Sequence, residues 1–325
     1  MIRVVFFGTH TLATTVLNEL ITAPDVEILA VVTQPDKPTG RGNKVEAPLI
    51  KKFAEQHQLP ALQFPKLKTD DAAQQLRARD ADVFIVAEYG LLIPETVLGI
   101  PARGVLNVHP SLLPKYRGAS PVQSALLNGD GETGVSVMLL DKEMDHGPVL
   151  AQERCVIDEH DTTPTLEAKL GRLGAALLIK TIPDWIAGKI QAREQDHTHA
   201  TFCKKLSRED GRIDWSQSAE HIYRMWRAYL PWPGIFTMWN GKRLKMTALV
   251  RHKGGHPEQS EAKPSEVEGS HTVPSTPFLT PDNQLAIACG TGVIIVDRLQ
   301  IEGKKELDAE AFLRGYPSFV GSRLE

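Results

Sequence analysis

An alternation of short apolar runs with amphipathic helical segments constrains this chain more than any other feature. The apolar runs are Arg3–Phe7, Val26–Thr33, Val83–Ala87 and Val105–Val108, with a short segment at Ala61–Gln63, and Val135–Leu140 and Val149–Ile157 extend the predicted sheet. Segments with helical spacing lie among them, at Leu12–Ile21, Pro48–His57, Asp70–Arg79 and Thr165–Ile186. Such runs are typical of strands that are buried on both faces. The pattern predicts a Rossmann-like α/β domain with a mostly parallel sheet covered by helices.

The pattern changes near residue 189. At roughly 150 residues per domain, a chain of 325 residues accommodates two domains. We expect a first domain over residues 1–189, a linker over 190–208 and a second domain over 209–325. The second domain should contain a helix at Ser218–Tyr229 and short strands, with an Asn240-Gly241 hairpin turn. Short strands in so few residues predict a small OB-like β-barrel, and Lys253–Thr280 is expected to be a solvated insertion.

The spacing of the cysteines and the length of the apolar runs indicate the cellular compartment of the protein. Cys155, Cys203 and Cys289 lie far apart, without a CxxC pair, which argues against a disulfide framework or a zinc site. The apolar runs are much shorter than a bilayer span, and the start of the chain does not have the pattern of a signal peptide. We therefore expect a cytoplasmic protein with no membrane partner and no metal.

The net charge of −3 is a weak guide to partners. Residues 1–203 carry 20 Lys and Arg against 25 Asp and Glu, whereas residues 204–325 carry 17 against 15. The second half is therefore slightly basic, a hint of nucleic-acid binding that chance would also explain.

The turn after the first strand does not carry a nucleotide-binding motif. Gly8-Thr9-His10-Thr11 follows that strand, and the chain contains neither GxGxxG nor a Walker A motif. A Rossmann-like fold therefore does not imply NAD or ATP here.

Asn107 and His109 end one of the predicted strands. Because side chains alternate along a strand, both should lie on one face at its carboxyl end, where open α/β sheets bind ligands. An amide donor beside an imidazole suits stabilisation of an oxyanion together with proton transfer. The alternative is a polar strand end that the following turn satisfies.

Asp145 lies in a tight turn bounded by Gly147 and Pro148. If this turn lies beside the end of the Asn107 strand, Asp145 could orient His109 and exchange protons with it. The alternative is a solvated acidic turn, and we interpret Asp141 and His146 as bystanders.

The segment Thr33–Lys44 follows the second strand and contains two prolines, two glycines and the cations Lys37, Arg41 and Lys44. It should form a flexible basic loop on the ligand-binding edge, suited to contacts with phosphates. An ordinary surface loop is the alternative.

The run Asn107–Gly118 resembles the NxHxSLLPxxRG signature of folate-dependent formyltransferases. Asp145 falls where that family keeps a catalytic aspartate. Within it, the chain resembles the methionyl-tRNA formyltransferases over almost its full length. The supporting segments are Thr33–Gly42, Tyr89–Leu91 with Pro94, Arg212–Ser216, Pro231–Pro233, Glu302–Lys305 and Phe312-Leu313.

The resemblance implies transfer of a formyl group from 10-formyltetrahydrofolate to the α-amino group of initiator methionyl-tRNA. It implies catalytic roles for Asn107, His109 and Asp145, and no metal. The residues that it implies for folate binding are Ser111, Leu112, Leu113, Pro114, Glu88, Tyr89, Gly90, Leu91, Leu92 and Glu143.

The implied partners are initiator methionyl-tRNA and the folate co-substrate, and we expect a monomer. Arg41 carries over from the family's acceptor-stem loop, with Lys37 and Lys44 beside it. The remaining tRNA contacts are expected from cations of the second domain and its approach: Lys204, Lys205, Arg243, Lys304, Lys305 and Arg323.

Two positions depart from the family pattern. Glu143 stands where the family commonly has glycine, and strain would follow if that position needs a positive φ. His10 stands where the family usually has proline, which affects the shape of the first loop.

Three alternatives remain at this point. A formyltransferase acting on a sugar-nucleotide amine would share the catalytic residues, but it generally lacks the Gly40-Arg41-Gly42 loop and the Glu302–Lys305 segment. A glycinamide-ribonucleotide formyltransferase is a single shorter domain. A binding module without activity would not need Asn107, His109 and Asp145 together.

Overall fold

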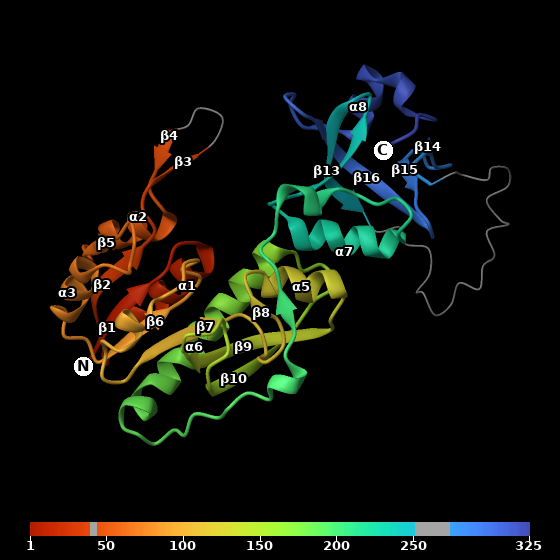
Figure 1. The fold of residues 1–325 in the computed structure, drawn as a ribbon. Helices are drawn as coiled ribbons and strands as arrows, with labels where there is room; N and C mark the ends of the chain where they lie inside the picture. Colours follow the sequence, from red (N-terminus) through yellow and green to blue (C-terminus); the bar gives the residue numbers. More distant parts are fainter. Residues whose placement is uncertain (40–43, 251–273) are drawn as a thin grey trace. The chain divides into compact units, whose positions relative to one another are not determined.

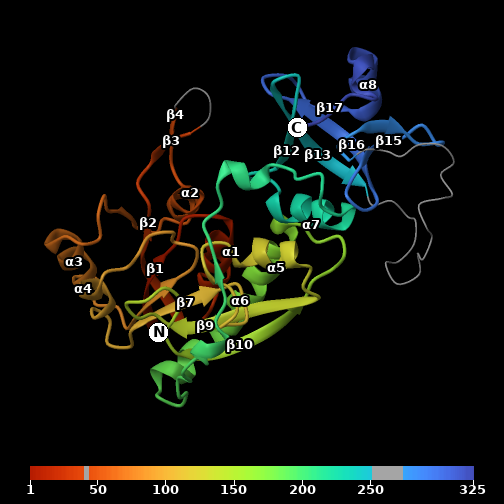
Figure 2. The same cartoon turned by 45° about the vertical axis from the view of Figure 1, so that its right-hand side comes forward.

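The computed structural model describes residues 1–39, 44–250 and 274–325, which form two compact units (Figures 1 and 2). The first unit comprises residues 1–125 and 130–205, and the second comprises residues 126–129 and 206–325. The division after Lys205 falls inside the segment expected to be a linker. Arg41 and most of the expected insertion lie outside the described residues.

The first unit is built on a seven-stranded sheet in the order β10-β9-β7-β6-β1-β2-β5. Its strands are β1 (Ile2–Phe7), β2 (Val26–Thr33), β5 (Ala61–Gln63), β6 (Val83–Val86), β7 (Val105–His109), β9 (Glu132–Leu139) and β10 (Val149–Val156). The five strands from β5 to β7 are parallel, whereas β9 runs antiparallel to both β7 and β10. The prediction of a mostly parallel sheet is confirmed.

Four helices of the first unit begin close to the predicted positions: α1 (Thr11–Leu20), α2 (Leu49–Gln56), α3 (Asp70–Arg77) and α6 (Thr163–Ile186). Two others were not predicted: α4 (Glu95–Leu98) and α5 (Pro121–Asn128, whose last residues belong to the second unit). Thr69 caps α3, and its hydroxyl accepts a hydrogen bond from Ala72 N at 3.2 Å. No helix in the described ranges is both long enough and apolar enough to cross a membrane.

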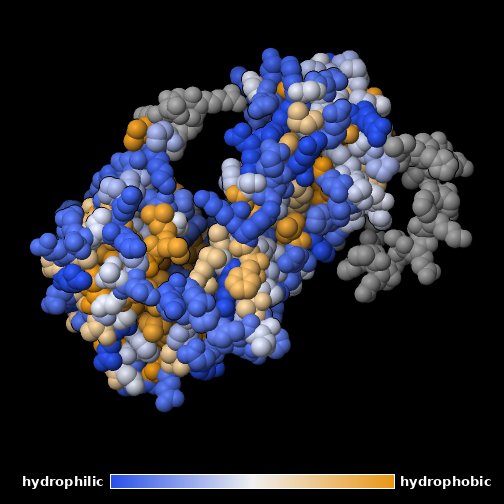
Figure 3. All heavy atoms as spheres, viewed as in Figure 1, coloured by the Kyte–Doolittle hydropathy of each residue, from blue (hydrophilic) through white to orange (hydrophobic). Residues whose placement is uncertain are grey.

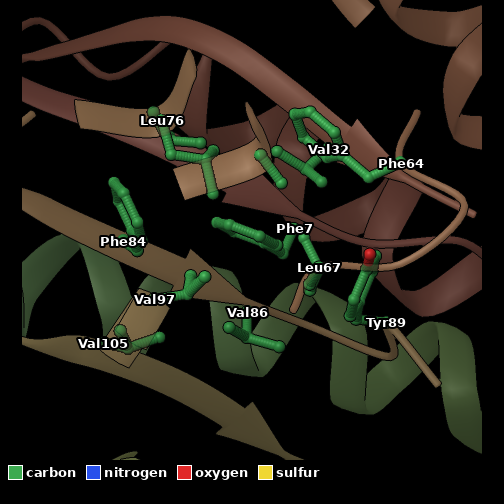
Figure 4. Close-up of a cluster of buried hydrophobic side chains, with 12 residues drawn as sticks. Phe7, Val32, Phe64, Leu67, Leu76, Phe84, Val86, Tyr89, Val97 and Val105 are labelled. Atoms are coloured by element: carbon green, nitrogen blue, oxygen red, sulfur yellow. The ribbon is translucent and has the colours of Figure 1, made fainter. Parts of the chain in front are cut away.

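The alternation of side chains along β1 divides the core between the two faces of the sheet. Val5 and Phe7 pack in a cluster with Phe84 of β6, Leu76 of α3 and Val97 of α4 (Figure 4). Phe6 lies on the opposite face. Its ring is close to Gly8, and so are Ala13 of α1 and Ile50 of α2. Burial on both faces explains why these strands read as continuous apolar runs.

The second unit is an antiparallel β domain, as expected for the smaller domain. Its sheet has the order β12-β13-β16-β15-β14, with β17 paired to β16. The strands are β12 (Ile235–Trp239), β13 (Lys242–Val250), β14 (Pro277–Leu279), β15 (Leu285–Ala288), β16 (Val293–Ile301) and β17 (Leu307–Asp308), and the helices are α7 (Ala219–Tyr229) and α8 (Ala309–Gly315). Asn240 and Gly241 both have positive φ (48° and 69°) and form the predicted hairpin turn.

Several short elements were not predicted from the sequence. They are the hairpin β3 (Lys37–Thr39) and β4 (Lys44–Glu46), the pair β8 (Arg117–Gly118) and β11 (Phe202–Cys203), and the 3₁₀ turns η1 (His197–His199), η2 (Arg208–Gly211) and η3 (Pro317–Phe319). β14 likewise lies within the expected insertion. β8 and β11 have only two residues each, which is too short to show a period, so only their pairing reveals them.

Gly174 gives a direct test of how α6 packs on the sheet. A Cβ atom at this position would lie 2.7 Å from Val108 Cγ1 and 3.2 Å from Val135 Cγ1. We expect Gly174→Val to lower the free energy of unfolding by about 1–3 kcal/mol through overpacking. Urea denaturation would measure the change. Gly131→Val, where an added Cβ would have no neighbour within 4 Å, should change it by less than about 0.5 kcal/mol.

Candidate active site at the edge of the sheet

The end of β7 presents Asn107 and His109 on one face, as the alternation predicted. Val105, two residues before Asn107, faces the cluster formed with α3 and α4, whereas Val108 faces Gly174 of α6. Asn107 is 9% exposed and His109 is 3% exposed. Two polar side chains so deeply buried need partners within the protein.

Asp145 supplies the common partner. Its Oδ1 accepts a hydrogen bond of 3.4 Å from Asn107 Nδ2 and lies 3.7 Å from His109 Nδ1. The structure therefore brings Asp145 together with the end of β7, although Asn107 and Asp145 are 38 positions apart in the chain. A carboxylate, an amide donor and an imidazole in contact can stabilise a developing oxyanion and move protons.

The second nitrogen of His109 determines its tautomer. His109 Nε2 lies 2.9 Å from the carbonyl oxygen of Tyr116. Because a carbonyl can only accept, Nε2 carries a hydrogen, and Nδ1 is the nitrogen that gains or loses a proton. That nitrogen faces Asp145, so Nδ1 is the nitrogen placed for proton exchange with the carboxylate.

Gly118 fixes the other oxygen of Asp145. The Gly118 N–H donates to Asp145 Oδ2 at 2.8 Å. Gly118 has φ +116°, and a Cβ atom there would lie 2.2 Å from the carbonyl oxygen of Cys203. Only glycine lets β8 approach β11 this closely while its amide points at the carboxylate.

The segment Ser111–Pro114 is held by backbone and hydroxyl contacts. Ser136 Oγ donates to the Ser111 carbonyl at 2.7 Å and accepts from Leu113 N at 3.0 Å. The Ser111 hydroxyl donates to the Lys115 carbonyl at 2.5 Å, and Leu113 packs with Met138. Ser111 therefore shapes the turn, which leaves backbone groups as the means by which this segment would contact a ligand.

The residues Glu88–Leu92 leave β6 at the same edge of the sheet. The Tyr89 ring lies in the core, edge-on to Phe7 with ring centroids 5.5 Å apart (Figure 4). The Tyr89 carbonyl accepts hydrogen bonds of 2.8 Å from both Thr9 Oγ1 and Gln34 Nε2. These bonds join the ends of β1, β2 and β6, so Tyr89 organises the loop while its ring serves the core.

Apolar side chains remain exposed on the two loops that leave the strands here. Leu91 is 45% exposed, Leu92 80% and Met144 52%, and Figure 3 shows apolar side chains gathered on one face of the first unit. Exposed side chains of this kind suit contact with an apolar ring of a ligand.

Glu143 does not have a positive φ, so the strain considered for this position does not arise. The left-handed residue of the turn is Asp145, with φ 49°. The Glu143 carboxylate lies 3.9 Å from His146 Nε2, and His146 in turn contacts Asp141 at 2.7 Å.

The predicted tRNA contacts fall into groups. Lys37 donates to Gln34 Oε1 at 2.6 Å, Lys44 begins β4, and Arg41 lies outside the described residues. Arg243 is engaged within the second unit, where it pairs with Glu209 at 2.9 Å and stacks on Phe236. The others are exposed: Lys204, Lys205, Lys304, Lys305 and Arg323.

Two further residues of the site were not predicted from the sequence. Arg117 is 3% exposed and Gln195 is 6% exposed, and they are hydrogen-bonded to each other beside Asp145. Arg117 stands in the signature run, which could have marked it. Gln195 falls in the segment interpreted as a linker, where nothing indicated a role.

A pair of carboxyl groups lies behind the site. Glu88 Oε2 accepts from Leu12 N at 3.0 Å, at the start of α1. Glu88 keeps an exposed surface, yet burial of its carboxyl group, with the nearby Glu167, raises its pKa to about 8. Burial also raises the pKa of Glu167, which accepts from Gln123, to about 7.

This pair predicts how stability depends on pH. Both pKa values lie above the ordinary value of 4.5, so the folded protein binds more protons than the unfolded chain. Stability is then highest below about pH 4.5 as far as these two groups are concerned, and is lost as the pH rises to about 8.

Glu88→Gln and Glu167→Gln should each show a smaller fall in Tm between pH 6 and pH 9 than the unsubstituted protein. In Glu88→Gln the new side-chain amide still offers an oxygen to Leu12 N, so the helix keeps its acceptor. Glu95→Gln, an exposed change at the start of α4, is the control. The assignment would be contradicted if the Tm of either variant fell between pH 6 and pH 9 by as much as the Tm of the parent.

Comparison with known proteins identifies the family. Residues 2–182 match the formyl transferase family model, and residues 205–317 match the formyl transferase C-terminal domain. The methionyl-tRNA formyltransferase of Roseiflexus castenholzii is 41% identical over 323 residues, covering 99% of each chain. That of Nitrosomonas eutropha is 37% identical over 324 residues, covering 99% of this chain and 98% of the relative.

Solved structures share the fold at lower identity. HypX from Aquifex aeolicus in complex with tetrahydrofolic acid aligns with TM-score 0.63 and 15% identity, covering 98% of this chain and 48% of HypX. The sugar 3N-formyl transferase WlaRD aligns with TM-score 0.59 and 19% identity, covering 94% and 99%. With two family models covering most of its length and full-length relatives near 40% identity, this chain belongs to the methionyl-tRNA formyltransferase family of folate-dependent formyltransferases.

Proposed function

We propose that this enzyme transfers the formyl group of 10-formyltetrahydrofolate to the α-amino group of initiator methionyl-tRNA, in the cytoplasm where translation starts. The observation that carries the proposal is the meeting of Asn107, His109 and Asp145 at one edge of the sheet. Full-length similarity to methionyl-tRNA formyltransferases supports the choice of acceptor.

The three residues divide the work of the transfer. As the amine attacks the formyl carbon, a C–N bond forms and the carbonyl oxygen becomes an oxyanion. Asn107 Nδ2 and the Nδ1–H of protonated His109 are the donors for that oxygen. Asp145 lies 3.7 Å from His109 Nδ1 and orients the imidazole.

Asp145 also balances the protons. It accepts the proton that the amine nitrogen loses once it has bonded to the formyl carbon, and it returns a proton to the folate nitrogen as the bond from that nitrogen to the formyl carbon breaks. The Gly118 amide holds Oδ2 throughout, so Oδ1 is the oxygen that exchanges protons. Both products are therefore neutral at their reacting nitrogen atoms. No covalent intermediate with the enzyme forms.

The neighbouring loops suit the folate co-substrate. We assign its ring to the backbone of Ser111–Pro114 and to the loop Glu88–Leu92, whose leucines remain exposed. The two loops are held rigidly by Ser136 and by the paired donors to the Tyr89 carbonyl. Rigid loops keep the formyl carbon close to the catalytic residues at little entropic cost.

An acceptor assay tests the proposal. The purified chain with 10-formyltetrahydrofolate should formylate initiator methionyl-tRNA and should leave amino-sugar nucleotides unmodified. Asp145→Asn should lower kcat by at least ~100-fold, because the exchanging carboxylate is lost. Product would be measured as acid-stable formylmethionine released from tRNA.

Asp141→Asn is the matched control for this assay. It makes the same chemical change in the same turn, and the new amide oxygen can still accept from Glu143 N. Its kcat should stay within about threefold of the parent, the range of effects expected away from the reacting groups. Formylation of an amino-sugar nucleotide in place of methionyl-tRNA would overturn the proposed acceptor.

Arg41 tests the tRNA assignment of the β3–β4 hairpin. Arg41→Ala should raise KM for methionyl-tRNA and reduce the salt dependence of tRNA binding by roughly one phosphate contact, while KM for the folate stays unchanged. Arg77→Ala, at an exposed position in the last turn of α3, is the control. Equal losses for both substrates would contradict the assignment.

A further inference from the structure

The turn that carries Asp145 needs outside support to keep its shape. Asp145 has φ 49°, a left-handed conformation that side chains other than glycine rarely adopt. Gly147 lies so close to β9 that a Cβ atom there would be 2.1 Å from the Leu139 carbonyl oxygen. A turn with such a backbone persists only when surrounding groups hold it.

Gln195 contacts this turn through both hydrogens of its amide. Gln195 Nε2 donates to the Asp145 carbonyl at 2.9 Å and to the Gly147 carbonyl at 2.7 Å. The side chain is 6% exposed, so water does not compete for these bonds. One buried amide therefore ties both ends of the Asp145–Gly147 turn.

Arg117 sets the direction in which that amide points. Gln195 Oε1 accepts from Arg117 Nε at 3.1 Å and from Arg117 Nη2 at 2.7 Å. An arginine can only donate, so it selects the orientation in which the Gln195 oxygen faces β8 and the nitrogen faces the turn. Arg117 is itself buried, at 3% exposed, and its Nη2 also lies 2.8 Å from His197 Nδ1.

Arg117 and Gly118 are consecutive residues of β8. Gly118 N holds the Asp145 carboxylate, while Arg117 orients the glutamine that holds the Asp145 main chain. β8 therefore holds the side chain of Asp145 directly, through Gly118, and its backbone indirectly, through Arg117 and Gln195.

We propose that Gln195 is a positioning residue for the formyl transfer, oriented by Arg117, which places Asp145 Oδ1 within reach of Asn107 and His109. This inference rests on the proposed function, because the assay that tests it measures formyl transfer. Gln195 touches neither substrate and acts through Asp145. Its removal should slow the chemical step without weakening the binding of either substrate.

Gln195→Glu is the sharpest variant. It keeps the size of the side chain and its pairing with Arg117, but it replaces both N–H donors with an oxygen that faces two carbonyls. Displacement of Asp145 by a fraction of an ångström should lower kcat by about 10- to 100-fold, with KM for each substrate within about threefold. Gln75→Glu, on exposed α3, makes the same change as a control.

A double-mutant cycle separates positioning from general destabilisation. If Gln195 acts through Asp145, adding Gln195→Glu to Asp145→Asn should cost less than about twofold more in single-turnover rate, because the group that it positions is already lost. If the variant unfolds, Arg117→Met/Gln195→Met leaves no buried charge without a partner and should show the same loss and the same lack of additivity.

A folded Gln195→Glu enzyme with kcat within about twofold of the parent would overturn the inference. So would a full further loss in the Asp145→Asn background. Failure of the proposed function looks different, because the parent enzyme would then not formylate methionyl-tRNA. The same cycle would in that event be measured with whichever amine the parent formylates.

Discussion

The hydrogen bond from Gly118 N to Asp145 Oδ2 is the contact on which the site depends. It joins a catalytic carboxylate to a strand of two residues, and that strand pairs with β11 from a segment much later in the chain. With Oδ2 held, Oδ1 is directed toward Asn107 and His109. The proton transfer we propose needs Oδ1 in that fixed place.

The parallel sheet places the other two residues of the site, Asn107 and His109. β7 ends among parallel strands whose carboxyl ends meet at one edge of the sheet. Because side chains alternate along a strand, Asn107 and His109 lie on the same face of the sheet as Val105, away from α6. The loops after β1, β2 and β6 converge on the Tyr89 carbonyl. The edge is therefore rigid on the side where we place the folate, and Gln195 and Arg117 make it rigid on the side of Asp145.

Strands buried on both faces could be predicted from the sequence, whereas elements that depend on long-range pairing could not. Val26–Thr33 and Ala61–Gln63 were predicted with the bounds that the structure shows. Val83–Val86 is buried along its whole length and is apolar throughout, as expected for a strand covered on both faces. β8 and β11 were missed, because two residues show no period. The role of Gln195 was missed for a related reason: its segment is polar and irregular, and its partners, Arg117 and Asp145, lie 78 and 50 residues away.

The sequence by itself determined the fold class, the presence of two domains and the identity of the three catalytic candidates, because periodicity and a dense local motif are properties of neighbouring residues. Only the tertiary structure decided which His109 nitrogen faces Asp145, which Asp145 oxygen the Gly118 amide holds and which glutamine contacts the turn. Those assignments depend on which donor meets which acceptor across the fold. Hydrogen bonds between residues distant in the chain leave no trace in composition or spacing.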